Sequence, residues 1–389
     1  MSANSSSAGG ARSTTSYRAG RVRSFWQRVT EGIQISDLWA QFQSEARTSY
    51  GLYSRDVDWE AVERGKRWKK PFRAAGALFW AMLMKLSPAR RVLLLLAIAA
   101  MLFTSFQVET EHRSVVIVSM GILSPGVILL FLLLALELAD RVTMKRDLEI
   151  ARDIQRWLVP EKPPDVPGYD IAFLTRAANT VAGDYYDVIL RPGAIRADDR
   201  ILFVVADVAG KSIPAAMLMA TFQASLRTLA VGNTSLAEIM AEMNRYACSN
   251  SQGGARFTTA FLAELNPATG EFSYVNAGHN VPILRRSSGA VYRPEVGGIP
   301  IGVLPTATYE VGTAQLGNGE WLVIFTDGVV EALNAKGEEY GEPELIRIID
   351  RGSALAPAEL LKNLLAGLDW FVGNTPQHDD MTCLLVKRN

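Results

Sequence analysis

The sequence predicts an α+β protein in which an antiparallel sheet, with helices outside it, follows a transmembrane hairpin and a helical linker. Two long uncharged stretches between residues 92 and 137 predict the hairpin. From residue 169 onward, short runs rich in β-branched and aromatic residues alternate with segments of helical pattern. Several of these runs are joined by turns as short as 266–270 (N-P-A-T-G), which is typical of antiparallel hairpins and argues against a doubly wound parallel sheet.

Composition and charge exclude several classes of protein. Hydrophobic residues make up 49% and charged residues 21% of the 389 residues, so the chain is neither disordered nor of low complexity. The net charge of zero conceals an asymmetry, because residues 1–91 hold 16 Lys/Arg against 7 Asp/Glu and the remainder holds 24 against 33. This distribution disfavours a nucleic-acid partner and places a basic segment at an anionic surface. With two distant cysteines and three histidines, any metal should be a hard cation held by carboxylates.

The first 91 residues divide into two segments. Residues 1–16 are rich in Ser, Ala and Gly and contain no apolar core, which predicts a disordered tail without a cleaved signal. Residues 17–91 are basic and helical in pattern, and we expect a cytoplasmic segment at the membrane surface. Within it, residues 25–61 fit a small soluble helical hairpin equally well. The uncharged run 74–84, flanked by Lys and Arg, suits an interfacial helix.

Two uncharged stretches predict a transmembrane hairpin over residues 92–137. The first covers 92–108, and the second covers 114–137 and is uncharged up to residue 136. A bilayer core requires about 20 helical residues, with about 17 as the lower limit. The alternative is a buried hairpin in a soluble protein. Because Arg and Lys flank the hairpin on one side, the positive-inside rule predicts an inner-membrane protein with both flanking regions in the cytoplasm.

Residues 138–160 predict a helical linker that ends at Pro160. Its apolar residues recur at steps of three and four and so share one helical face: Met144, Leu148, Ala151, Ile154 and Leu158. This face fits two arrangements. It can pack against the following domain, or it can pair with a second copy in a parallel coiled coil, which would make the protein a homodimer.

The remainder, residues 161–389, predicts a single mixed domain. The expected strands are 171–175, 185–190, 201–205, 259–265, 272–276, 321–326 and 381–386, and the expected helices are 214–230, 236–247 and 356–371. A sheet with helices on its outside is the arrangement that this alternation favours.

Four aspartates share one pattern, in which an apolar strand is followed by Asp and a turn: Asp184, Asp207, Asp327 and Asp379. Carboxylates gathered at buried strand ends repel one another unless cations neutralise them. Oxygen ligands suit Mg²⁺ or Mn²⁺, and two such ions about 3.5–4 Å apart can clamp a phosphoryl group and activate a water molecule. The sequence contains no P-loop, no dinucleotide-binding glycine motif and no nucleophile elbow. Lys211, at the start of the helix after the second aspartate, could meet an anion.

Six motifs in order make residues 149–387 resemble the SpoIIE/RsbU-type serine phosphatases, a branch of the metal-dependent protein phosphatases of type 2C. They are 182–187 (A-G-D-Y-Y-D), 206–216 (A-D-V-A-G-K-S-I-P-A-A), 276–280 (N-A-G-H-N), 297–302 (G-G-I-P-I-G), 326–331 (T-D-G-V-V-E) and 378–382 (H-D-D-M-T). The resemblance implies an α-β-β-α sandwich of two antiparallel sheets, with two Mn²⁺ or Mg²⁺ ions in the cleft between them.

The resemblance also implies roles for individual residues. Asp207 would bridge both ions and the Val208 carbonyl would bind one of them, while Asp184, Asp327 and Asp379 would complete the set directly or through water. Asp380 would support these ligands without binding metal itself. Eukaryotic relatives carry a histidine, often taken as the general acid, where this chain has Ala209, and no arginine matches their phosphate-binding arginine. The general acid is therefore open, with Lys211 or a metal-bound water as candidates.

The implied function is a membrane-anchored phosphatase that hydrolyses phosphoserine or phosphothreonine on a protein partner. In bacterial signalling, the resemblance points to an anti-anti-sigma-type regulator as that partner. The first alternative is a pseudophosphatase that binds a phosphoprotein or an anti-sigma partner without turnover. A metal-dependent cyclase or nuclease is the second, which the acidic character of the domain and the lack of a base-reading motif disfavour.

Overall fold

The computed structural model describes the chain in five stretches: 70–105, 125–191, 199–232, 234–250 and 256–389. The chain divides into two compact units, Met1–Ala139 and Asp140–Asn389. The predicted tail and most of the predicted basic segment lie outside the described residues, as does the region 106–124, which belongs to both predicted membrane spans.

The described part of the first unit is helical. It comprises α4 (Lys70–Lys85), α5 (Pro88–Ser105) and the beginning of α6 (Pro125–Leu158). Helices α5 and α6 approach closely at Gly126, where an added Cβ would lie 2.9 Å from the Ala97 carbonyl oxygen. Arg90 on α5 donates a hydrogen bond of 3.1 Å to Glu137 on α6. Of the helices in the described stretches, none combines the length and the apolar character that crossing a membrane requires.

The second unit contains two sheets. One has the strand order β1-β11-β10-β6-β7, and the other has the order β2-β3-β4-β5-β8 with β9 paired to β5. Every pairing is antiparallel except that of β5 with β8. The strands are β1 (Tyr169–Arg176), β2 (Tyr185–Arg191), β3 (Arg200–Val208), β4 (Thr258–Leu265), β5 (Glu271–Ala277), β6 (Ile283–Arg285), β7 (Val291–Tyr292), β8 (Gly297–Gly298), β9 (Gly312–Gln315), β10 (Trp321–Phe325) and β11 (Met381–Arg388).

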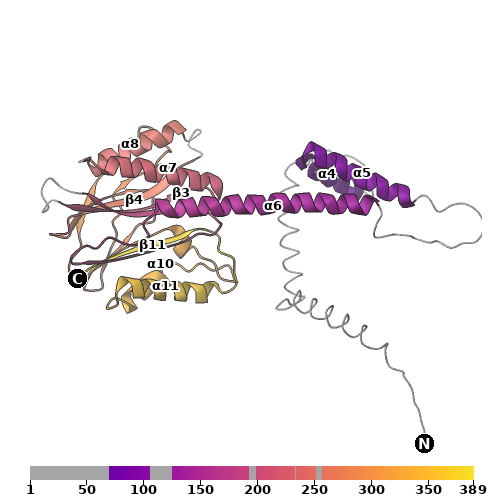
Figure 1. The fold of residues 1–389 in the computed structure, drawn as a ribbon. Coiled ribbons are helices and arrows are strands. Elements are labelled where there is room, and N and C mark those ends of the chain that lie inside the picture. Colours follow the sequence, from indigo (N-terminus) through magenta and orange to yellow (C-terminus); the bar gives the residue numbers. More distant parts are fainter. Residues whose placement is uncertain (1–69, 106–124, 192–198, 233, 251–255) are drawn as a thin grey trace, which may run out of the picture. The chain divides into compact units, whose positions relative to one another are not determined.

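Helices cover the outer faces of both sheets. The helices α7 (Ile213–Ala230) and α8 (Leu236–Asn250) lie on one side of the strands, and α10 (Glu342–Arg351) and α11 (Pro357–Val372) lie on the other (Figure 1). Three apolar clusters fill the resulting layers: one under α7 and α8, one between the sheets, and one under α10 and α11. The predicted antiparallel architecture with helices outside is therefore confirmed for this unit.

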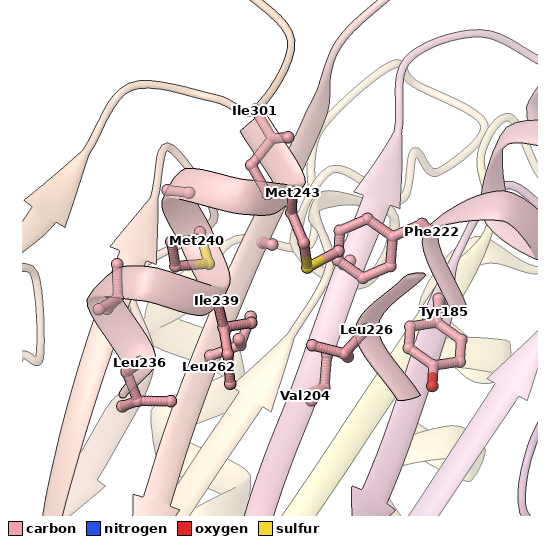
Figure 2. Packing of buried hydrophobic residues seen from close by; sticks show 14 of the residues in the cluster. Tyr185, Val204, Phe222, Leu226, Leu236, Ile239, Met240, Met243, Leu262 and Ile301 are labelled. Atoms are coloured by element: carbon pink, nitrogen blue, oxygen red, sulfur yellow. The ribbon is translucent and has the colours of Figure 1, made fainter. Parts of the chain in front are cut away.

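Strand β3 illustrates why the central strands are apolar at almost every position. Leu202 and Val204 point into the cluster under α7 and α8, while Phe203 and Val205 point into the cluster between the sheets. Because side chains alternate between the two faces of a strand, a strand covered on both faces is hydrophobic at every position. Figure 2 shows the cluster under α7 and α8, where Phe222 of α7 lies near Met243 and Leu226.

The expected strands and helices of the second unit are all present, with ends that differ by a few residues. The strands β6 to β9 and the helices α9 (Asp327–Val330) and α10 were not expected. Each of these strands has two to four residues, too few for a run of alternating or β-branched residues to stand out.

The predicted linker is the C-terminal part of the single helix α6. From Leu148 onward one side of this helix is partly buried, including Ala151 and Leu158. Met144 and Ile154, which were expected on the same apolar face, are instead exposed. The packed face is therefore partly polar, and residues 148–159 lie against the domain that follows them.

Candidate active site

Two of the predicted metal-binding aspartates come from one sheet. Asp207 lies near the end of β3, and Asp184 immediately precedes β2. Because Tyr185 pairs with Ala206 in the antiparallel register, Asp184 arrives opposite Asp207. The Val208 carbonyl oxygen is close by, since a Cβ added to Gly183 would lie 3.2 Å from it.

The other two predicted aspartates come from the second sheet. Asp327 begins the short helix α9 directly after β10, and Asp379 precedes β11. The strands β10 and β11 pair in an antiparallel register, which brings the end of one beside the beginning of the other. A Cβ at Gly328 would lie 1.9 Å from the Asp380 carbonyl oxygen, so only glycine allows this close approach.

The pKa shifts of these carboxylates indicate that Asp184 and Asp207 lie near Asp327 and Asp379. Burial raises the pKa of Asp207 to about 7, and the charges of Asp327, Asp379 and Asp380 contribute to this increase. Burial and the neighbouring Asp207 raise the pKa of Asp184, although hydrogen bonds from Thr382 and Thr326 oppose the increase. The structure thus brings together the four carboxylates that the sequence singled out, in a position where their negative charges disfavour one another.

Threonine hydroxyls connect the two sheets at this point. The Thr326 hydroxyl donates a hydrogen bond of 2.8 Å to Asp184 and accepts one of 2.9 Å from the Thr382 backbone N–H. Thr326 is the single residue between β10 and α9, whereas Asp184 immediately precedes β2 in the other sheet. The side chain of a fully buried threonine therefore fixes one predicted ligand relative to the strands that carry the other pair.

Lys211 lies at the edge of the carboxylate cluster. Its Nζ is 2.9 Å from Asp379 Oδ2 and donates a hydrogen bond of 2.6 Å to the His378 carbonyl oxygen. The lysine also lowers the pKa of Asp327, which burial and Asp379 raise overall. Lys211, predicted to meet an anion, is thus placed beside the carboxylates, with more than half of its side chain exposed.

The loop that carries Lys211 has an unusual backbone. Gly210 has φ of 116°, and Ser212 has φ of 63° with ψ of −146°. Among the described residues, Ser212 is alone in combining a positive φ with a side chain. That region of backbone space is strained for L-residues, and such strain is typical of functional sites.

Gln155, to which the sequence assigned no role, and Asp380, which was expected to support the ligands, hold the segment leading to Asp184. The Gln155 amide on α6 makes a reciprocal pair of hydrogen bonds with Ala182, donating to its carbonyl at 2.6 Å and accepting from its N–H at 3.0 Å. The Asp380 carboxylate accepts hydrogen bonds from the backbone N–H groups of Ala178, at 2.7 Å, and Gly183. The backbone around Asp184 is therefore fixed from both the linker helix and the second sheet.

Sequence signals for these two contacts are weak. Gln155 is a polar residue on the packed face of a helix, which is unusual enough to suggest a specific partner. The identity of that partner, Ala182, depends on how the helix docks and cannot be read from the chain. Asp380 directly follows the predicted ligand Asp379 and was expected to support the ligands, but the backbone groups that its carboxylate binds depend on how the loop folds.

Asp187, the last residue of the 182–187 motif, has a structural role. It is fully buried and forms two hydrogen bonds with Arg227 of α7, of 2.8 and 2.9 Å, and a third with the Tyr185 hydroxyl. A buried carboxylate is stable when its oxygens are paired in this way. Asp187 therefore attaches α7 to β2 rather than joining the carboxylate cluster.

His279 supports the site from outside it. Burial lowers its pKa to about 4, so the ring is neutral at ordinary pH. Its backbone N–H and carbonyl both bond to the Asn276 side chain, and its Nδ1 is 3.0 Å from the Thr259 hydroxyl. Thr259 pairs with Asp207 across the β3–β4 ladder. These contacts give the N-A-G-H-N motif a structural role at a turn beside the site.

The donor set fits hard divalent cations. Buried carboxylates that raise one another's pKa require a compensating positive charge, and Mg²⁺ or Mn²⁺ supplies it through oxygen ligands. Asp184, Asp207, Asp327, Asp379 and the Val208 carbonyl are the groups that would hold such ions. As the side chains now stand, no three His, Cys, Asp or Glu residues in the described stretches are grouped tightly enough to hold one ion.

Comparisons with known proteins find similar chains. The family model of the stage II sporulation protein E (SpoIIE) matches residues 197–389. The protein IcfG of Synechocystis sp. is 28% identical over 284 residues, which cover 66% of this chain and 44% of IcfG. The phosphoserine phosphatase RsbU of Bacillus subtilis is 27% identical over 246 residues, which cover 63% of this chain and 71% of RsbU. The chain thus matches less than half the length of IcfG.

Solved structures show the same fold. The SiaA-PP2C domain of Pseudomonas aeruginosa superimposes with a TM-score of 0.56 at 22% identity, covering 64% of this chain and 99% of that domain. The likeness extends to an α+β fold of two sheets with covering helices. Together with the matching family model and the relatives, it shows that this chain carries a SpoIIE/PP2C-type serine phosphatase domain similar to that of RsbU.

Proposed function

We propose that the protein hydrolyses phosphoserine or phosphothreonine on a protein substrate, using two Mn²⁺ or Mg²⁺ ions. The convergence of Asp184 and Asp207 with Asp327 and Asp379 is the observation that carries this proposal. These carboxylates, with the Val208 carbonyl, are the proposed ligands, and Asp207 is the proposed bridge. When bound, such ions neutralise the phosphoryl oxygens and activate the attacking water.

The chain's own residues would position the substrate and move protons. Lys211 is partly exposed beside Asp379, so its ammonium group can donate a hydrogen bond to a phosphoryl oxygen at the edge of the site. The serine leaving group requires a proton, and Lys211 is the proposed donor from the chain. Gln155 and Asp380 would keep the Asp184 backbone in place while the charges of the site change.

The proposed substrate is a phosphorylated regulatory protein in bacterial signalling. RsbU is named as a phosphoserine phosphatase, and its similarity to this chain supports phosphoserine as the substrate class. We propose an anti-anti-sigma-type regulator as the partner. A pseudophosphatase that binds the same partner without turnover is the second candidate, and the strained Ser212 loop beside an intact set of aspartates favours the active enzyme.

We also propose that the protein is anchored in the inner membrane with its phosphatase domain in the cytoplasm. The support is the sequence itself, in which the uncharged stretches 92–108 and 114–136 are flanked by Arg and Lys on one side. Full-length protein should then fractionate with membranes, and protease added outside intact spheroplasts should leave the phosphatase domain uncut. Recovery of full-length protein in the soluble fraction without detergent would refute the proposal.

The activity is tested with purified full-length protein, an aryl phosphate and a phosphoserine protein. Turnover of both substrates is expected with Mn²⁺ and none with excess chelator. A chain that binds the phosphoprotein but hydrolyses neither substrate at saturating Mn²⁺ would establish the pseudophosphatase instead. Release of a cyclic nucleotide or cleavage of a nucleic acid would contradict both candidates.

A further inference from the structure

We propose that a hollow between α6 and the segment before β2 binds an acidic stretch of the substrate beside its phosphorylated residue. The inference deepens the proposed function and rests on it, since it concerns what the same site recognises. The hollow has a volume of about 740 Å³ and reaches Asp184 at one end. All of its lining belongs to the unit Asp140–Asn389.

One wall of the hollow is a single face of α6. Lys145, Glu149, Arg152 and Arg156 line it, and they follow one another at steps of four, three and four residues. Residues at these steps lie on the same side of a helix. The opposite wall is formed by the neutral residues 177–180, so the wall provides no acidic partner for the three cations.

Two of the three cations of this wall, Lys145 and Arg156, are available to a ligand. Lys145 and Arg156 are exposed, and within the described part of the chain neither has an ion-pair partner. The Arg152 Nε is buried without a hydrogen bond to any described residue, and it lies 3.6 Å from Asp153 Oδ1. With Arg152 paired to Asp153, Lys145 and Arg156 against Glu149 still give this wall a net positive charge, although the hollow also reaches Asp184 of the carboxylate cluster.

The dimensions indicate how long the recognised stretch is. Gln155 contacts Ala182, two residues before Asp184, and therefore marks the end of the wall nearest the site. From Gln155 back to Lys145 the helix rises about 15 Å. An extended peptide covers about 3.3–3.6 Å per residue, so four or five residues span the wall. We therefore infer acidic residues within about five positions of the phosphoserine, on one side of it.

The test compares two phosphoserine peptides that differ only in these flanking positions, acidic in one and Asn or Gln in the other. Lys145→Glu combined with Arg156→Glu reverses two exposed charges of the wall. Arg146→Glu is the matched control, because Arg146 is exposed on the same helix but does not line the hollow. Exposed ion pairs are individually weak, so we expect the double variant to lower kcat/KM for the acidic peptide about tenfold.

Two further measurements isolate the effect. Hydrolysis of an aryl phosphate, which has no flanking residues, should be unchanged in the double variant. Binding of an acidic peptide with a non-hydrolysable phosphoserine analogue, followed by fluorescence anisotropy, should weaken by a similar factor, and the difference should shrink at high salt. The binding assay reports on the hollow even if the protein has no turnover, which separates failure of this inference from failure of the proposed function.

Several results would overturn the inference. They include equal losses in the double variant and in Arg146→Glu, equal losses for the acidic and neutral peptides, and wild-type affinity of the double variant for the acidic analogue. Binding of vesicles with anionic lipid that depends on Lys145 and Arg156, without any preference for the acidic peptide, would assign the cations to a membrane surface instead.

Discussion

At the scale of single residues, the carboxylates of the site repel one another. Asp184 and Asp207 are held opposite each other by the β2–β3 register, and Thr326 prevents the first from turning away. The raised pKa values follow directly from this crowding, because burial and like charges both favour the protonated acid. A substitution that removes one of these charges should therefore affect the protein differently when metal is bound and when it is absent.

Asp207→Asn is the first prediction. Loss of the proposed bridge should reduce metal-dependent hydrolysis at least about 10³-fold, which corresponds to about 4 kcal/mol in the transition state. In excess chelator the same variant should unfold at a higher temperature than wild type, because one repelling charge is gone. Activity and thermal unfolding measured with Mn²⁺ and with chelator check both effects. Near-normal turnover of the variant at saturating Mn²⁺ would eliminate Asp207 as the bridge.

The second prediction concerns pH. Asp207 has a pKa of about 7 when folded, against about 3.9 in an unfolded chain, so the stability linked to it is present at low pH and is lost as pH rises through 7. Protons compete with metal for the same oxygens. The increase in Tm caused by Mn²⁺ should consequently be larger at pH 7.5 than at pH 5.5, and binding should release protons.

A control is needed because His279 acts in the opposite sense. Its pKa of about 4 means that the unfolded chain takes up a proton first as pH falls below about 6.5, which destabilises the fold in acid. Comparing samples with and without Mn²⁺ at each pH cancels this contribution. A Mn²⁺-induced increase in Tm that is independent of pH would show that the raised carboxylates are not the ligands.

Gln155→Leu provides the third prediction. The change preserves helical propensity but leaves both backbone groups of Ala182 without partners, which costs about 1–3 kcal/mol for each group that stays buried. Because Ala182 lies two residues before Asp184, the variant should need a several-fold higher Mn²⁺ concentration for half-maximal activity. At saturating Mn²⁺, kcat should recover to within about twofold. Asp147→Asn, an exposed change on the same helix, serves as the control, and an unchanged Mn²⁺ requirement in Gln155→Leu would refute a positioning role.

At the scale of elements, α6 presents two different sides. One side reaches the phosphatase domain through Leu148, Gln155 and Leu158. The other leaves Ile150, Ile154 and Trp157 exposed at steps of four and three, with Trp157 80% exposed. We expected one apolar face to serve either the domain or a second copy of the chain. The exposed stripe is the surface through which we propose that α6 forms a homodimer.

The fourth prediction tests whether the rotational setting of α6 controls activity. A single residue inserted beside Arg146 rotates the helix before the insertion by about 100° relative to the packed part, whereas seven residues nearly restore the setting. Full-length protein with one inserted residue should therefore lose regulation or activity, and protein with seven should approach wild type. Phosphatase assays and the oligomeric state of both variants provide the measurement. Equal behaviour of the two insertions would mean that α6 is a passive tether.

At the scale of the whole molecule, the fold was predictable wherever burial left a pattern in the chain. Strand β3 is apolar at almost every position because both of its faces are covered, and that run is easy to recognise. Strand β8 has two residues, both glycine, and at Gly297 the backbone carbonyl of Asn276 is too close for any side chain. No local pattern marks such a strand.

The site could be predicted in part for a related reason. The expected pattern of an apolar strand followed by Asp holds for Asp207 and Asp327, whereas Asp184 and Asp379 precede their strands, β2 and β11. The antiparallel registers nevertheless bring these strand ends together. The contacts of Gln155 with Ala182 and of Lys211 with Asp379 join residues far apart in the chain. Those contacts depend on how separate layers pack, which one sequence does not record.

The origin of the four aspartates has a mechanical consequence for the domain. Asp184 and Asp207 belong to the sheet that contains β2 and β3, and Asp327 and Asp379 flank strands of the other sheet. Ions held by all four would form a reversible cross-link between the two halves of the sandwich. Loading the site would then add a connection between the sheets to those made by Thr326, Asp380 and the apolar cluster between them. Metal content would in this way affect how firmly the two sheets are joined at the site, as well as its chemistry.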